Sequence, residues 1–251
     1  MHWGNVLAAA DETAAGLHAV RVARELASAS GLRLSVVTVL PPGTDQVPAA
    51  LAEFHPQVAH GIPGIEIVRV ADELQADLLV LGRTLHPDAD SMRLGPTADQ
   101  VARRSRSPCL FVPAEQDRFV QHLVALDGSE RGFAVFETAR EFVRLSGGTI
   151  QVVTVEPVEA SSGDALPQAR SVRVANALDK LVRQGGARRG IPLQVLRGEP
   201  VRMVHNALKD PTSDLLVVGA RRGGPAGPPL SSGVGRMLLY TAHCAVLTVP
   251  I

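Results

Sequence analysis

The sequence predicts an α/β protein made of two tandem copies of one domain, each an open parallel five-stranded sheet with helices on both faces. The first observation is an internal repeat. Val36–Val39 returns as Val152–Val155, 116 residues later, and Ala76–Gly82 returns in similar form as Ser213–Gly219, 137 residues later. Two constant offsets indicate a duplicated domain with 21 extra residues in the second copy. The second observation is that short Val- and Leu-rich runs alternate with helical stretches, which favours right-handed crossovers and buried parallel strands.

The first copy, residues 1–113, is expected to hold five strands with helices between them. Thr13 can cap the first helix, whose apolar residues recur at helical spacing, and Pro41 with Pro42 ends the second strand. The Pro- and Ala-rich stretch that follows has room for one short helix. In order we expect a strand at 6–10, a helix from 14, a strand at 34–40, a short helix within 43–56, a weak strand at 58–60, a helix at 65–75, a strand at 78–81, a helix from 95 to about 104 and a strand at 110–112.

The second copy, residues 119–251, repeats this order after a polar linker at about 114–118. Its long second helix accounts for the 21 extra residues, and Ser129 can cap its first helix. In order we expect a strand at 122–126, a helix from 129 to about 145, a strand at 149–155, a helix at 165–189, a strand at 193–197, a helix at 200–209, a strand at 214–218, a helix at 233–242 and a strand at 245–249.

Each copy ends in an apolar strand, 110–112 in the first and 245–249 in the second. An exposed edge strand of this kind is a liability unless it is paired or covered. Pairing the two edges with each other removes both at once. We therefore expect the copies to pack as an intramolecular pseudo-dimer about an approximate two-fold axis, while a further homodimer of whole chains is left open.

The composition narrows the classes of partner. The formal net charge is zero, which gives no case for nucleic acid as the main partner. No apolar run reaches the roughly 18 residues that a membrane span needs, and a basic segment typical of a signal peptide is absent. Cys109 and Cys244 occupy different places in the repeat, so a structural disulfide is not expected and a reducing cytoplasm is. The eight histidines show no metal-ligand spacing.

Parallel sheets bind ligands beyond the carboxyl ends of their strands, so the loop at 219–236 is the first candidate site. Backbone N–H groups of glycines and the helix start beyond them suit phosphate oxygens, and a side chain at Gly219 would fill that space. Arg221, Arg222 and Arg236 have no Asp or Glu near them in sequence, so we expect no carboxylate opposite them. The alternative is a surface loop with solvated arginines. The loop holds six glycines, at 219, 223, 224, 227, 233 and 235.

The matching loop of the first copy is poorer in these features. Asp88 and Asp90 would repel a phosphate chain, and Pro96 has no N–H to offer where the helix begins. We therefore expect the first copy to be the degenerate one, structural rather than ligand-binding. Asp11 and Asp127 each end a strand and precede a helix. Such a residue can form the turn before the helix, or it can place a carboxylate beside a ribose. One residue can have both roles.

This repeat unit, with its Asp after the first strand, its Asp-Leu-Leu-Val-Val-Gly run and its closing Val-Leu-Thr-Val-Pro, resembles the universal stress protein family over nearly the whole chain, a Rossmann-like fold. ATP-binding members carry a loop of the form G-x-x-G-x9-G-[S/T]. Gly219 fits its first position, while Arg222 and Ser232 stand at the other glycines and Gly233 at the Ser/Thr. The resemblance implies adenine near Val155, ribose near Asp127 and phosphates on the loop. The implied contacts are Asp127, Val155, Gly219, Arg222, Gly223, Gly224, Ser232, Gly233 and Val234.

The sequence therefore predicts a cytoplasmic tandem universal stress protein that binds ATP or another adenine nucleotide, with Mg²⁺ accompanying it, in its second half. Its expected role is that of a regulator or sensor in the stress response. No general base is placed opposite the loop, so an enzyme is not expected, although weak ATP hydrolysis is left open. The alternative is a nucleotide-free scaffold or interaction protein of the same fold, and the protein partner is unknown.

Overall fold

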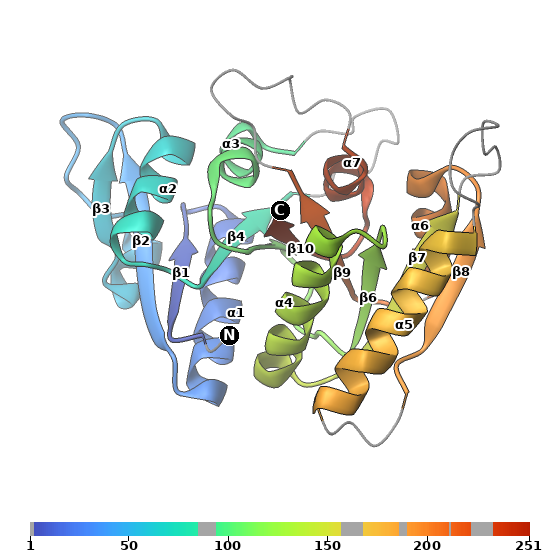
Figure 1. The fold of residues 1–251 in the computed structure, drawn as a ribbon. Coiled ribbons are helices and arrows are strands. Elements are labelled where there is room, and N and C mark those ends of the chain that lie inside the picture. Colours follow the sequence, from blue (N-terminus) through green and yellow to red (C-terminus); the bar gives the residue numbers. More distant parts are fainter. Residues whose placement is uncertain (1–2, 85–93, 157–167, 186–189, 211, 222–232) are drawn as a thin grey trace.

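The computed structural model of the chain describes residues 3–84, 94–156, 168–185, 190–210, 212–221 and 233–251. Its centre is one continuous ten-stranded sheet with the strand order β3-β2-β1-β4-β5-β10-β9-β6-β7-β8 (Figure 1). Strands β1 to β5 form the first half and β6 to β10 the second, and neighbours within each half are parallel. The predicted fold class is confirmed. The strands are β1 Asn5–Ala9, β2 Arg33–Leu40, β3 Gln57–His60, β4 Leu78–Arg83, β5 Cys109–Pro113, β6 Gln121–Leu126, β7 Thr149–Glu156, β8 Leu193–Arg197, β9 Leu215–Ala220 and β10 Ala245–Pro250.

The helices cover both faces of this sheet. Helices α1, α4 and α5 contribute to one buried apolar cluster, and α2, α3, α6 and α7 contribute to the other. Helix α1 also packs against α4, so the two halves touch through helices as well as through the sheet. None of the described helices is both long and apolar enough to cross a membrane. The helices are α1 Ala14–Ser30, the 3-10 helix η1 Ala49–Phe54, α2 Pro63–Glu73, α3 Pro96–Arg104, α4 Glu130–Ser146, α5 Gln168–Gly185, α6 Pro200–Leu208 and α7 Val234–Thr241.

The two halves join where β5 pairs with β10, and this is an antiparallel pair between otherwise parallel sheets. Leu110 lies opposite Leu247, and these two residues are equivalent in the repeat because they are 137 positions apart. Thr248 lies opposite Cys109 on one side of them. A pair of equivalent residues facing each other marks an approximate two-fold axis. The predicted pairing of the two closing strands is confirmed.

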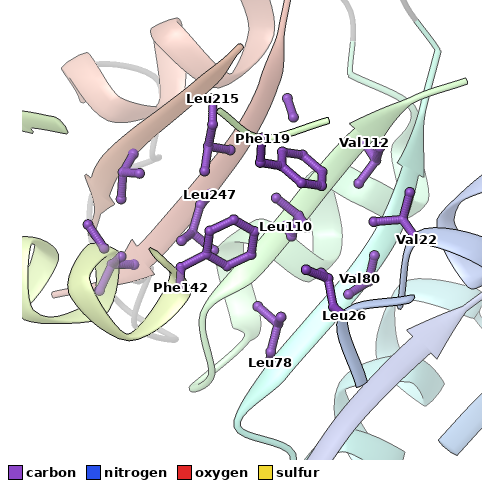
Figure 2. Packing of buried hydrophobic residues seen from close by; sticks show 14 of the residues in the cluster. Val22, Leu26, Leu78, Val80, Leu110, Val112, Phe119, Phe142, Leu215 and Leu247 are labelled. Atoms are coloured by element: carbon purple, nitrogen blue, oxygen red, sulfur yellow. The ribbon is translucent and has the colours of Figure 1, made fainter. Parts of the chain in front are cut away.

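One apolar cluster runs without a break across this join. Figure 2 shows Leu78 and Leu110 of the first half beside Phe142 and Leu247 of the second, and each of these side chains is fully buried. The ring of Trp3 packs edge-on against Phe142, with 6.4 Å between ring centroids. Because burial of apolar surface is the main stabilising contribution to folding, this shared cluster stabilises the contact between the two halves.

The repeat also preserves the anchors that hold the strand starts together. Asp77 accepts hydrogen bonds from the backbone N–H groups of Gly4 (2.7 Å) and Asn5 (2.9 Å). Its equivalent in the second half, Asp214, accepts from the N–H groups of Val120 (2.6 Å) and Gln121 (3.1 Å). In each half this carboxylate ties the beginning of the fourth strand to the beginning of the first. The aspartate of the Asp-Leu-Leu-Val run therefore has a structural role in both halves.

Most element ends differ from the predicted ones by one or two residues, for local reasons. Helix α2 begins at Pro63 instead of 65, because proline needs no N–H at a first helical position and its ring presets the helical φ. It ends at Glu73, since Gln75 takes a left-handed φ of 50°. Helix α5 confirms the longer crossover of the second half, where the first half has only the 3-10 helix η1. The expected ends of that long helix, 165–167 and 186–189, lie outside the described residues.

Candidate functional site

The second half contains a cavity of about 390 Å³ beyond the carboxyl ends of β6, β7 and β9. Strand β6 lies between β9 and β7, so the chain reverses its direction of travel across the sheet at this point. Open α/β sheets bind ligands at such a switch point. We call this space the second-half cavity; its walls include Asp99, Ala102, Arg103, Ala125, Asp127, Val135, Val153, Val155, Pro200, Val204, Val218, Gly219, Arg221, Gly233, Val234, Gly235, Arg236, Leu238 and Ile251.

The floor of the second-half cavity is apolar. Ala125, Val153, Val155 and Val218 come from three adjacent strands and line it together. Val155 is 6% exposed, and with Val153 it belongs to the apolar cluster on that face of the sheet. The sequence predicted Val155 at this site, and the structure places it there. An apolar floor of this kind suits an aromatic ring.

Asp127 follows β6 and forms one wall of the cavity. Its Oδ1 accepts hydrogen bonds from the N–H (2.9 Å) and the hydroxyl (2.7 Å) of Ser129, while Oδ2 takes part in neither. Ser129 in turn caps α4 by accepting from the N–H of Gly132 at 3.0 Å. A Cβ at Gly132 would lie 2.6 Å from Asp127 Oδ1, so only glycine lets the carboxylate sit there. Asp127 therefore has the predicted turn role and also lines the cavity.

The end of β9 and the start of α7 form the opposite wall. Gly219, Gly233 and Val234 line it, and the N-cap residue Gly233 makes no side-chain capping bond. A Cβ at Gly235 would lie 2.0 Å from Gly219 O, so the helix start is packed directly against the strand. The first N–H groups of a helix carry partial positive charge, which favours an anion in this wall. The other predicted contacts, Arg222, Gly223, Gly224 and Ser232, lie outside the described residues.

At Gly219 the space that a side chain would take is occupied by other parts of the protein. We expected its missing side chain to leave room for phosphate. Instead, a Cβ at Gly219 would lie 2.8 Å from Ile251 Cδ1 and 3.2 Å from Val135 Cγ2. The space beside this glycine is already filled by apolar side chains, because its Cα faces helix α4 and the chain end. Gly219 lines the cavity through its backbone.

The expectation for Arg236 is also corrected, because the first half supplies a carboxylate. Asp99 of α3 accepts a hydrogen bond from Arg236 at 3.0 Å and from Arg103 at 2.8 Å, and the hydroxyl of Tyr240 donates to it as well. Burial alone would raise the pKa of Asp99, but hydrogen bonds from Arg103 and Tyr240 and the charge of Arg236 outweigh it and lower that pKa. We call these four residues the join cluster.

Sequence reasoning missed Asp99 and Arg103, although the repeat held a signal for them. At the offset of 137, Asp99 is equivalent to Arg236 and Arg103 to Tyr240. Equivalent positions near a two-fold axis face each other, so Asp99 and Arg236 could have been paired once the axis was placed at Leu110 and Leu247.

The first half also contains a cavity, of about 400 Å³, in the equivalent place. Asp11, Gly82 and Pro96 line it, and Pro96 is the first residue of α3, where it has no N–H to donate. Asp88 and Asp90 lie outside the described residues. Arg83 is 4% exposed and donates to the carbonyls of Ala242 (2.5 Å) and Cys244 (3.1 Å), and burial lowers its pKa to about 10. That the first half does not bind ligand stays a prediction.

Comparison with known proteins places this fold and cavity in a family. The model of the universal stress protein family matches residues 52–113 and 121–250. The chain belongs to the universal stress protein family. A universal stress protein of Methanocaldococcus jannaschii is 33% identical over 60 residues, or 24% of this chain and 35% of that protein. The chain thus matches about a third of the length of that curated relative.

Solved structures show the same whole-chain architecture. A universal stress protein from Archaeoglobus fulgidus superposes with a TM-score of 0.71 and 14% identity, covering 98% of both chains. A protein of unknown function from Pseudomonas aeruginosa PAO1 gives a TM-score of 0.72 and 15% identity, covering 99% of this chain and 92% of the other. At these identities the likeness shows the fold. The tandem arrangement of the universal stress protein fold is therefore shared with other solved proteins.

Proposed function

We propose that this universal stress protein binds an adenine nucleotide in the second-half cavity and acts in the cytoplasm as a regulator or sensor in the stress response. The observation that carries the proposal is the composition of that cavity. An apolar floor at Val153 and Val155 lies between a carboxylate at Asp127 and a helix start at Gly233 with no side-chain cap. A base, a sugar hydroxyl and a phosphate need these three surfaces in one place.

The cavity fits such a ligand in size and chemistry. Its volume of about 390 Å³ lies within the range of roughly 300–1,000 Å³ usual for small-molecule sites. Adenine would lie on Val155, the ribose hydroxyls would donate to Asp127, and the phosphates would accept from the backbone N–H groups at the start of α7. Mg²⁺ would be bound by the phosphate oxygens of the nucleotide. Among the described residues, no group of three or more His, Cys, Asp or Glu side chains is arranged to hold a metal ion.

We expect binding without efficient turnover. Asp99 and Asp127 are the described carboxylates around the cavity. Asp99 is bonded to two arginines, and the oxygen of Asp127 that Ser129 does not use would accept from the ribose hydroxyls, so neither carboxylate is left as a general base for an attacking water. Positioning and charge stabilisation without a base would leave hydrolysis slow.

A nucleotide-free scaffold is the second candidate, and one observation favours it. Ile251 and Val135 fill the space beside Gly219, so phosphate cannot approach that glycine from the direction in which a Cβ would point. A scaffold of this fold would keep the cavity without using it.

Thermal unfolding with ATP, ADP and AMP tests the proposal. Ligand at about 100 times its dissociation constant stabilises the fold by roughly 2.7 kcal/mol, which for this chain length raises the melting temperature by about 5–10 °C. Val155→Trp should abolish the rise, because the indole would occupy the floor. Val39 is the equivalent residue in the first-half cavity, so Val39→Trp is the matched control and should leave the rise intact.

Two results would contradict the proposal. If millimolar nucleotide leaves the melting temperature of the unmodified protein unchanged, the scaffold is the better description. If Val39→Trp removes the rise while Val155→Trp does not, the ligand binds in the first half.

A further inference from the structure

We infer that the first half completes the ligand site of the second half, and that Arg103 on α3 binds the anionic part of the ligand. This inference rests on the proposed function and adds a residue to it. Asp99, Ala102 and Arg103, all from α3, line the second-half cavity together with residues of the other half. By contrast, the described residues that line the first-half cavity all come from the first half. Among the described residues, the second-half cavity thus has a composite wall and the first-half cavity does not.

The join cluster leaves a positive charge on this wall. It contains one carboxylate, Asp99, between two guanidinium groups, Arg103 and Arg236. One of the two positive charges is therefore not neutralised within the cluster. Arg221 lines the same cavity and is exposed to solvent. An anion is the ligand group that matches a cavity wall with this charge balance.

Among the described residues, both guanidinium groups have N–H donors that are not used on Asp99, while Arg103 also interacts with Tyr240. Arg103 reaches one oxygen of Asp99, Oδ2, through Nε and Nη2, and its Nη1 takes part in neither contact. Arg236 uses Nη2 for the other oxygen and for Tyr240, and its Nε and Nη1 take part in neither of these two contacts. Asp99 therefore holds the two forks in fixed positions while taking up only part of the N–H groups of each. A planar guanidinium held in this way loses little side-chain entropy when it binds a phosphate.

The exposure of the cluster agrees with this role. The side chains of Arg103, Asp99 and Arg236 are 35%, 20% and 19% exposed, so they are neither fully solvated nor closed off. A partly desolvated ion cluster is screened less by water and salt than a surface pair is. An anion that binds here meets a stronger field than it would at Arg104, which follows Arg103 on α3 and is exposed.

Only the pairing of unlike halves can build this wall. Asp99 and Arg236 are equivalent in the repeat and meet across the approximate two-fold axis. Two copies of the first half joined in the same way would place Asp99 against Asp99, and two copies of the second half would place Arg236 against Arg236. Like charges in direct contact are repulsive. The tandem chain thus places an arginine opposite an aspartate, which neither half would do when paired with a copy of itself.

Isothermal titration calorimetry on the full chain tests the inference with adenosine, AMP, ADP and ATP. Arg103→Gln should weaken ATP and ADP binding by about 10-fold to 100-fold, the range expected for the loss of a charge-assisted hydrogen bond. Adenosine should bind within about twofold of the unmodified protein, since it carries no phosphate. Arg104→Gln is the matched control, one position along the same helix, and should bind all four ligands unchanged.

Arg103→Lys serves as a second variant, because it keeps the charge that faces Asp99 but loses the planar fork. It should fall between the unmodified protein and Arg103→Gln in its affinity for ATP. A loss that is equal for adenosine and ATP, or no loss in either variant, overturns the inference and leaves the proposed function standing. If the unmodified protein binds none of the four ligands, the proposed function fails, and this inference fails with it.

Discussion

The contact between α7 and β9 gives a quantitative prediction for Gly235→Ala. The added Cβ would lie 2.0 Å from Gly219 O and 3.1 Å from Gly219 C. Both are backbone atoms of a central strand, so no side chain can rotate away to relieve the overlap. Because carbon and oxygen approach no closer than about 3.3 Å even in favourable contacts, the helix start must move by about 1 Å.

The expected cost follows from two opposing effects. Overpacking a close contact costs about 1–3 kcal/mol, and often more when backbone must shift. Replacing glycine by alanine within a helix recovers up to about 1 kcal/mol of conformational free energy. We expect a net loss of about 2 kcal/mol in the free energy of unfolding, which corresponds to about 4–8 °C in melting temperature. The displaced helix should also weaken nucleotide binding, since Gly235 lines the cavity.

Urea unfolding followed by far-ultraviolet circular dichroism measures this loss. The control is Gly233→Ala, two residues earlier, where an added Cβ meets nothing within 4 Å. It should cost less than about 1 kcal/mol, from the poorer N-cap alone. Equal stability of the two variants, or a Gly235→Ala protein more stable than the parent, would show that α7 does not press on Gly219. The position equivalent to Gly235 in the first half is Ala98, which has a Cβ. The fold therefore accepts alanine at this place in one half, and the predicted cost is specific to the contact in the other.

Two further predictions concern buried polar groups. Arg83→Ala removes the donors to the carbonyls of Ala242 and Cys244 and leaves a cavity. The free energy of unfolding should therefore decrease by about 3 kcal/mol. The control is Arg106→Ala at an exposed position, which should change the free energy of unfolding by less than about 0.5 kcal/mol. Burial lowers the pKa of His122, so as pH falls below about 6.5 the unfolded chain binds a proton that the folded chain does not. The free energy of unfolding should therefore decrease from pH 7 to 5, and His122→Phe should flatten that slope; parallel pH profiles would refute this assignment.

Local patterns in the sequence were enough to predict the order of elements and the doubling of the fold. Thr13 and Ser129 cap their helices as predicted, since a hydroxyl before a helix satisfies a backbone N–H three residues later. The two closing strands pair as predicted, because an apolar edge strand needs a partner. Element ends were less accurate, as at Pro63, where the apolar spacing starts later than the helix does.

The tertiary structure alone decided which groups meet at the candidate site. Asp99 and Arg236 are 137 residues apart, and nothing local to either one indicates the other. Gly219 lines the cavity, but Ile251 and Val135 reach it from other parts of the fold and occupy the space beside it, which no local pattern indicated. Periodicity and turn chemistry act over a few residues and are visible in sequence. Contacts across the two-fold axis depend on how two folded halves are placed, and so the arginine wall of the cavity appears only when the halves join.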